Sequence, residues 1–471
     1  MTTDKQHQRY QLTGLLMLGL MFLILLGRIT AIDLFDSAAH LVTILLVILG
    51  WRVMGLREIY LLSCCFILSG LAYYLLGFQP IIYQEAFAQA AFLMAFLLIL
   101  SLLHEAAMTS QSVEECGQFL TRQKAGRRFA ALFLGSNLMS VLFNLGLVSI
   151  LTPLIQKGIE QDKGNPSLMK LREQRQITAM LRGFAWCVVW SPTAIAPLAV
   201  FELIDGISRQ LWTAYGIVFA LVMFGLGWAE DQWRFRHIKR QPSSSDIIPF
   251  PTSAFLQFGL ILTILFGMAV ILSLLFNDSI VFGLLISCPL VMLGWLYQQT
   301  KNKPRKERFP AFAKRLDEIS FLALPKNHQI IITLAASGFI GRISAGMIPA
   351  ENLANILGLY VMPDYLFLSL LSIAMIPVSF LGVSPIMMAV FFGSILGALP
   401  ILPADPTLVA LAISSGWAVS MTTSPFATVV LMISRLNNIS PLLLTLRWSG
   451  MFSVLALCLL SAMFFVITGG T

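Results

Sequence analysis

The sequence predicts an all-α polytopic membrane protein with about 11 transmembrane helices and two re-entrant hairpins, arranged in two inverted five-span repeats. The composition gives the first reason, because 57% of the 471 residues are hydrophobic, only 11% are charged, and the mean hydropathy is +0.82. Apolar runs long enough to cross a bilayer recur along the chain. Two stretches 233 positions apart nearly repeat each other, which indicates an internal duplication.

Each duplicated stretch is an apolar span that a Ser-Pro pair interrupts. The shift of 233 positions superposes Gly183 on Gly416, Ser191 on Ser424 and Pro192 on Pro425. A proline inside a helix removes an amide donor and crowds the preceding turn, so backbone carbonyls lose their partners. Paired broken helices in corresponding positions of two halves are typical of a transporter binding site.

The first half begins with a leading span in residues 1–36, whose apolar run 12–27 is expected to be a retained helix rather than a signal peptide. The first repeat, 37–230, contains spans 38–51, 59–77 and 83–103, a hairpin at about 127–158, a broken helix at about 177–203 and a span at 211–229. The alternative for the hairpin is one continuous helix with a buried asparagine. A polar linker, 231–252, follows.

The second repeat, 253–471, has the same order of elements. Spans are expected at 254–276, 280–297 and 329–347, with an amphipathic interfacial helix at 312–322. A hairpin follows at about 363–400, then a broken helix at about 408–436 and a last span at 442–467.

Charge predicts the orientation and excludes one class of partner. The formal net charge is +8, but the basic residues gather in connections on one side, as the positive-inside rule requires of cytoplasmic loops. We therefore expect an integral protein of a bacterial inner membrane, with a cytoplasmic N-terminus and no nucleic-acid partner. The six cysteines have no metal-ligand spacing and are expected to be packing residues.

The hairpin tips and breaks carry a resemblance to a known family. The first tip, Asn144-Leu145-Gly146, keeps an asparagine followed by Pro153, whereas the second tip, Gly382-Val383-Ser384-Pro385, has no asparagine. The breaks are Trp190-Ser191-Pro192-Thr193 and Thr422-Thr423-Ser424-Pro425. In this arrangement the chain resembles the ion transporter superfamily, in particular the divalent anion/sodium symporters and the citrate transporters.

That resemblance implies secondary active transport of a small organic or inorganic anion, with carboxylates favoured, by an elevator-like movement in a homodimer. Coupling to sodium or to protons stays open, and neither a resident cofactor nor a metal other than transported sodium is expected. The candidate substrate- or ion-binding residues are Asn144, Gly146, Ser191, Pro192, Thr193, Gly382, Ser384, Pro385, Thr422, Thr423, Ser424 and Pro425. Hydroxyl, amide and carbonyl oxygens suit a hard cation, and helix N-termini suit an oxyanion.

Four other side chains are weighed separately. Trp190 and Trp417 lie close to the breaks and are expected either to form a wall of the substrate site or to pack. Arg342 lies inside a span, which favours attraction of an anion, a structural ion pair, or extension of its side chain to the outer surface. Arg182 lies at the inner end of the first broken span, where its side chain is expected to extend to the membrane surface.

Other functions remain as alternatives. An antiporter or exporter of another small solute is the nearest one, and a passive channel is a more distant one. An intramembrane enzyme is disfavoured, because the chain has neither a Gly-x-Ser-x-Gly nor a His-Glu-x-x-His motif.

Overall fold

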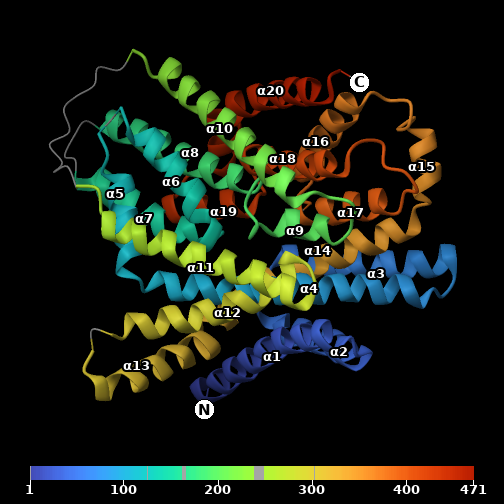
Figure 1. The fold of residues 1–471 in the computed structure, drawn as a ribbon, viewed down its shortest axis with the longest axis horizontal. Coiled ribbons are helices and arrows are strands. Elements are labelled where there is room, and N and C mark those ends of the chain that lie inside the picture. Colours follow the sequence, from blue (N-terminus) through green and yellow to red (C-terminus); the bar gives the residue numbers. More distant parts are fainter. Residues whose placement is uncertain are drawn as a thin grey trace. The chain divides into compact units, whose positions relative to one another are not determined.

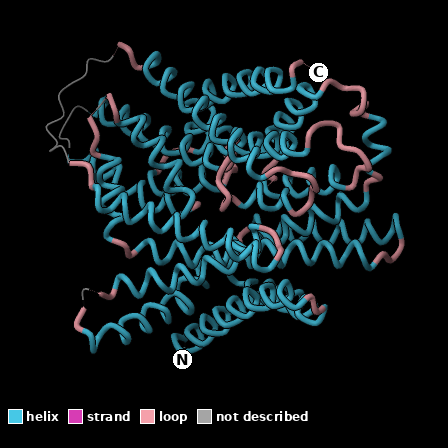
Figure 2. Tube along the Cα trace, viewed as in Figure 1, coloured by secondary structure: helices cyan, strands magenta, loops and turns pink. Residues whose placement is uncertain are grey.

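The computed structural model describes residues 2–124, 126–161, 166–237, 249–301, 303–383 and 385–470, and within these ranges it contains helices and no strands (Figure 2). Ten helices in these ranges are long and apolar enough to cross a membrane. They are Gln8–Thr30, Asp33–Val53, Leu56–Leu76, Pro80–Met108, Arg209–Arg234, Thr252–Phe276, Ile280–Gln299, Arg305–Met347, Pro406–Asn437 and Leu443–Thr468. The protein is therefore an all-α integral membrane protein, as the sequence predicts.

The chain folds into two compact units, and each consists of two separate stretches of sequence (Figure 1). Unit 1 comprises Met1–Ser110 and Gln257–Ile348, and unit 2 comprises Gln111–Leu256 and Pro349–Thr471. This division follows packing and not the order of the chain, so each unit takes elements from both expected repeats. The repeat boundaries stay a prediction.

Unit 1 is built on two long buried helices. Its α-helices are α1 (Thr2–Thr30), α2 (Asp33–Gly50), α3 (Leu56–Leu76), α4 (Pro80–Met108), most of α11 (Thr252–Phe276), α12 (Ile280–Gln299), α13 (Arg305–Glu318) and α14 (His328–Met347). The helices α4 and α14 pack along each other, and α3 and α12 pack beside them. The segment 312–322, expected as a separate interfacial helix, instead continues into α14 through the π-turn Ile319–Ala323 and a 3-10 turn, Leu324–Asn327.

Unit 2 contains the segments of both hairpins and both broken helices that the sequence predicts, and the re-entrant insertion of the hairpins stays a prediction. Its helices are α5 (Gln111–Thr121), α6 (Arg128–Phe143), α7 (Gly146–Gln161), α8 (Pro166–Cys187), α9 (Ile195–Phe201), α10 (Arg209–Arg234), α15 (Ala350–Ile356), α16 (Asp364–Phe380), α17 (Pro385–Gly397), α18 (Pro406–Thr423), α19 (Thr428–Asn437) and α20 (Gly450–Thr468). A π-turn, Leu443–Ser449, leads into α20.

The centre of unit 2 is the pair α8 and α18, the first segments of the two broken helices. They contact each other, and each is buried over three or more turns. Helix α6 packs on α8, and α16 packs on α18 in the same manner. The second segment of each broken helix packs against the other half, because α9 contacts α17 and α19 contacts α7. The core of unit 2 therefore needs helices from both halves.

Two glycines at equivalent positions allow this packing. A Cβ added at Gly183 would lie 2.2 Å from the Phe133 carbonyl oxygen of α6, and one at Gly416 would lie 2.6 Å from the Ser372 carbonyl oxygen of α16. Both distances are shorter than a non-bonded contact allows, so each helix pair meets backbone to backbone at a glycine. The superposition of Gly183 on Gly416 thus has a structural counterpart.

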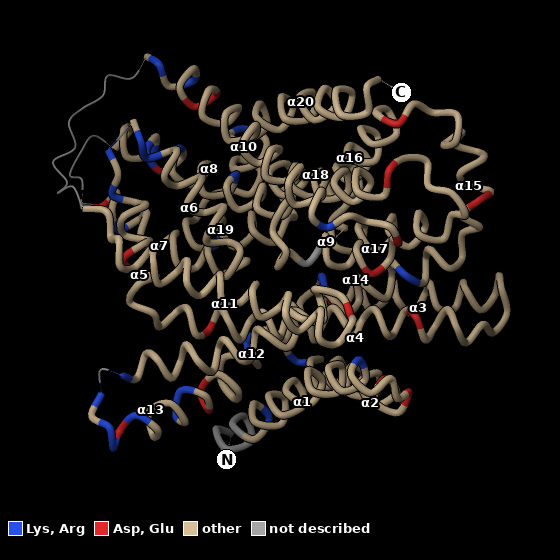
Figure 3. The backbone as a smooth tube through the Cα atoms, in the orientation of Figure 1, with Lys and Arg blue, Asp and Glu red and all other residues tan. Residues whose placement is uncertain are grey.

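In the described ranges, nine of the expected spans lie in membrane-length helices, while the two broken spans, residues 177–203 and 408–436, are divided between α8 and α9 and between α18 and α19. The charged residues gather at helix ends, in connections and in α13, while the long helices are mostly uncharged (Figure 3). Half of the expected linker, residues 238–248, lies outside the described residues.

The cysteines fit the expected packing role in the described ranges. All six are free, and Cys116, Cys187 and Cys288 are buried. Burial raises the pKa of the Cys116 thiol in α5 to about 11, so this side chain is a neutral thiol at physiological pH.

We expect Gly183→Ala and Gly416→Ala each to lower the free energy of unfolding by about 1–3 kcal/mol, because the added methyl group forces two helix backbones apart. Gly225→Ala on α10 is the matched control, since no atom lies within 4 Å of its added Cβ. Helix propensity alone should make that control neutral or slightly stabilising. Thermal unfolding of the detergent-purified variants measures the effect, and equal melting temperatures for all three would contradict it.

Candidate functional site

The two breaks have the same backbone and side-chain hydrogen bonds. At the end of α8 the amide of Ser191 donates to the Cys187 carbonyl over 2.9 Å, and at the end of α18 the amide of Ser424 donates to the Ser420 carbonyl over 2.8 Å. In each case the serine hydroxyl accepts a 3.3 Å bond from the amide two residues later. The serines therefore close the same turn twice, 233 positions apart.

A proline at each break frees a carbonyl group. Pro192 and Pro425 follow the two serines and have no amide hydrogen to donate to the carbonyls of Val188 and Met421, four residues earlier. The chain resumes a helix at Ile195 in the first half and at Thr428 in the second. Both expected broken helices are therefore interrupted at the predicted Ser-Pro positions.

The hydroxyl groups at the breaks are already hydrogen-bonded within the protein. The Thr193 hydroxyl donates to the Val141 carbonyl of α6 over 2.6 Å and lies 2.9 Å from the Ser191 hydroxyl. The Ser424 hydroxyl donates to the Ser379 carbonyl of α16 over 2.8 Å. The Thr422 hydroxyl pairs with that of Ser453 at 2.9 Å, and the Thr423 hydroxyl donates to the Val419 carbonyl of its own helix. In this conformation these hydroxyl groups hydrogen-bond the residues of the breaks to the surrounding helices.

The same bonds place a helix–helix turn beside each break. Val141 lies one turn before Asn144, which joins α6 to α7 with a φ of 45°. Ser379 precedes Gly382, which has a φ of 79° between α16 and α17. Gly146 and Pro385 begin the following helices, and Ser384 lies outside the described residues.

Asn144 differs from the other polar candidates. Its amide nitrogen donates to the Ser140 carbonyl over 2.9 Å, but within the described ranges its side-chain amide makes no hydrogen bond. The side chain is half-buried. Asn144 therefore offers a free oxygen and a free amino group at the first tip.

The remaining candidates lie apart from this arrangement or have defined partners. Trp190 is half-buried and donates its indole N–H to Asn137, and Trp417 is half-buried on α18. Arg342 belongs to unit 1, where its guanidinium pairs with Glu85 at 2.8 Å. This contact is the structural pairing that the sequence left open, and attraction of an anion by Arg342 stays a prediction.

Comparison with solved structures finds a similar fold. The crystal structure of the Alcanivorax borkumensis YdaH transporter aligns over 88% of this chain and 98% of its own, with a TM-score of 0.56 and 14% sequence identity. The chain shares the fold of that transporter. No protein-family profile and no curated protein matches the sequence. At this identity the likeness shows the fold, and function has to be argued from the site.

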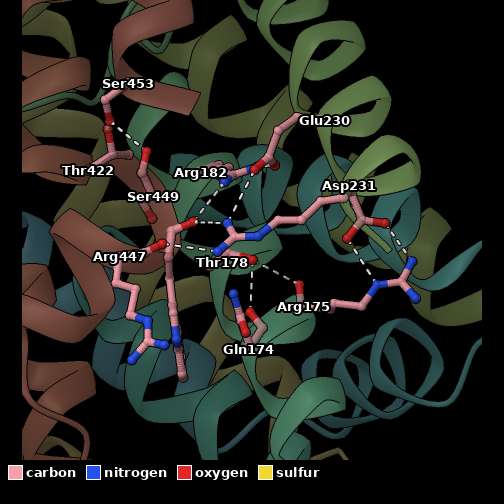
Figure 4. A network of polar contacts seen from close by, with 12 residues as sticks. Gln174, Arg175, Thr178, Arg182, Glu230, Asp231, Thr422, Arg447, Ser449 and Ser453 are labelled. Atoms are coloured by element: carbon pink, nitrogen blue, oxygen red, sulfur yellow. Dashed lines mark hydrogen bonds and ion pairs between the residues drawn. The ribbon is translucent and has the colours of Figure 1, made fainter. Parts of the chain in front are cut away.

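Unit 2 also contains a buried charge cluster that sequence reasoning missed (Figure 4). Arg182 of α8 donates to Glu230 of α10 over 2.8 Å, and both side chains are at most 3% exposed. Arg234 contacts the other Glu230 oxygen at 3.3 Å. Next to this pair, Arg175 donates to Asp231 over 3.0 Å. The expectation that Arg182 extends to the membrane surface is therefore wrong.

The cluster also holds the π-turn before α20. Arg234 donates to the carbonyls of Trp448 and Arg447 at 3.0 Å each, and Arg182 donates to Trp448 at 3.4 Å. The Arg182 guanidinium also lies 4.3 Å from the centre of the Phe452 ring. One sequence signal was available, because Arg175 and Arg182 are seven residues apart and so share a helix face. Their acidic partners are too distant in sequence to be assigned from spacing.

We expect Glu230→Ala to destabilise the protein by about 3–5 kcal/mol, because Arg182 is left charged and buried without a counter-ion. Asp231→Asn is the matched control and should cost less, since its partner Arg175 is 24% exposed and can reach water. The double variant Arg182→Met/Glu230→Met should recover most of the loss, because both charges of the buried pair are then removed together. Unfolding of the purified variants measures these changes in stability. If the double variant loses as much free energy of unfolding as the two single substitutions together, the ion-pair explanation is wrong.

Proposed function

We propose that the protein is a secondary active transporter of a small organic or inorganic anion, with carboxylates favoured, and that sodium or protons drive it. The observation that carries the proposal is the pair of equivalent breaks in membrane-spanning helices, each fastened beside a helix–helix turn. Irregular backbone at membrane depth is tolerated only inside protein or around a polar site. Fold likeness to the YdaH transporter adds support.

The site we propose centres on the first tip and both breaks. Asn144 supplies an uncommitted side-chain amide, and the carbonyls of Val188 and Met421 lack their helical donors because of the prolines. Oxygen ligands of this kind suit a cation, while the amino group of Asn144 suits a carboxylate. The hydroxyls of Ser191, Thr193 and Ser424 then act mainly as structural fasteners.

An elevator-like mechanism is part of the proposal. Both breaks and both adjoining turns belong to unit 2, whereas unit 1 has none of them in its described residues. A body that carries the whole site can move as one piece, which is what an elevator requires. The inverted repeats, the re-entrant insertion of α6/α7 and α16/α17, the cytoplasmic N-terminus and a homodimer complete the proposal.

We expect a small carboxylate to raise the melting temperature of the purified protein, by mass action on the native state. The panel contains succinate, citrate, acetate and sulfate, each with and without sodium and at two pH values. Ligand at about 100 times its dissociation constant contributes about 2.7 kcal/mol of stability. Asn144→Gly should remove this shift while keeping the backbone conformation, because glycine accepts a positive φ.

Asn438→Gly is the matched control, since Asn438 also has a positive φ, of 53°, but ends α19 at an exposed position. It should keep the ligand shift. In proteoliposomes, uphill uptake that collapses with the ion gradient supports a coupled transporter, while uptake that only equilibrates indicates a channel. If no anion shifts the melting temperature, the anion assignment is wrong, and product formed without a gradient would indicate an enzyme.

A further inference from the structure

The indole of Trp190 is fixed at the first break by a single side chain. Its N–H donates to the Asn137 side-chain oxygen over 2.9 Å, and the Asn137 amino group donates to the Gly183 carbonyl over 3.0 Å. Asn137 belongs to α6 and is only 9% exposed. One amide therefore connects α6, the last part of α8 and the break itself.

The carboxamide of Asn137 makes both bonds from one side chain. The indole N–H is a donor only and the Gly183 carbonyl is an acceptor only, so the bridging group has to accept one bond and donate the other. A carboxylate at position 137 would bond the indole and repel the carbonyl, and an aliphatic side chain would bond neither.

Among the described residues, the second break has no such bridge. The position equivalent to Trp190 is Thr423, whose hydroxyl donates to the Val419 carbonyl of its own helix. The corresponding link between helices is made by Ser372 of α16, which donates to the Ala412 carbonyl of α18 over 2.8 Å and holds no aromatic ring. The two breaks share their backbone bonds but differ in this side-chain clamp.

The Trp190 side chain is more exposed than the two side chains that follow it. Ser191 is 1% and Thr193 is 3% exposed, and their hydroxyls bond within the protein, whereas Trp190 between Asn137 and the break is half-buried. Of these three side chains at the first break, the indole is the one that a bound molecule can touch. A bulky ring with fixed orientation excludes or admits ligands by shape.

We propose that Asn137 is a positioning residue that locks the Trp190 indole as a rigid wall of the substrate site, so that this wall sets how much apolar bulk an anion may carry. The proposal rests on the proposed function, since it concerns the same site. Asn137 touches no substrate and acts through Trp190. Its role is specificity, distinct from the charge recognition assigned to Asn144.

The first experiment tests the clamp without transport. Protein labelled with 5-fluorotryptophan gives a ¹⁹F signal for each of its nine tryptophans, and the signal missing in Trp190→Phe belongs to Trp190. Asn137→Ala and Asn137→Asp should each shift or broaden that signal. Ser372→Ala, which removes the helix link of the second half, should leave it unchanged. An unshifted Trp190 signal in both Asn137 variants overturns the clamp.

The second experiment tests specificity in proteoliposomes with succinate and phenylsuccinate, which carry the same two carboxylates and differ by a phenyl group. Asn137→Ala and Trp190→Phe should change the ratio of their KM values by about tenfold in the same direction. The double variant should change it no more than Trp190→Phe alone, because both substitutions act through one ring. Ser372→Ala should keep the wild-type ratio.

The outcomes separate the two proposals. If both anions are transported and the KM ratio is unchanged in Trp190→Phe, the wall is refuted while the transporter assignment stands. If Asn137→Ala lowers Vmax for both anions and leaves the KM ratio unchanged, Asn137 is a packing residue and the inference fails. Ser372→Ala should then have the same effect on Vmax. If the wild type transports neither anion, the specificity role falls with the anion assignment, and the ¹⁹F signal still decides the clamp.

Discussion

An interrupted helix inside a membrane has to satisfy its own backbone, and unit 2 is organised by this constraint. Lipid offers no hydrogen bonds, so each break must be closed by protein groups. The serine hydroxyl closes the turn from within, and the Thr193 and Ser424 hydroxyls fasten it to the neighbouring helix. Those bonds need helix backbones in direct contact, which Gly183 and Gly416 provide. The packing of α6 on α8 and of α16 on α18 follows from the same requirement.

The two halves of unit 2 share this framework and differ in the side chains attached to it. Asn144 stands at one tip and Gly382 at the other, and Trp190 corresponds to Thr423. Arg182 corresponds to Ser415, so the buried ion pair also belongs to the first half alone. The packing at the breaks is thus the same in both halves, while the residues of the proposed binding chemistry differ between them.

The sequence predicted the breaks because their cause is local: a proline with no amide hydrogen to donate follows a serine whose hydroxyl accepts a bond from the amide two residues later. Their fastening was not predictable, because Thr193 and its acceptor Val141 are 52 residues apart and no pattern joins them. The sequence also names Ser191, Thr193 and Ser424 as binding candidates. The structure shows their hydroxyls bonded within the protein, and their part in binding stays a prediction. Arg182 was misplaced because its partner Glu230 is 48 residues away. The composition of each unit from two separate stretches depends on packing that spacing does not encode.

The short sequence separations within each half bear on biogenesis. Arg182 and Glu230 both precede the linker, so the arginine meets its counter-ion before residues 349–471 have been synthesised. The first break likewise finds Val141 within its own half, and Ser424 finds Ser379 within the other. The contacts between the halves, among them those of α8 with α18, α7 with α19 and α9 with α17, wait for the complete chain. Each half can therefore leave the translocon with its break closed. In the first half, Glu230 can already neutralise the buried arginine, so the nascent protein avoids the cost of inserting an unpaired charge.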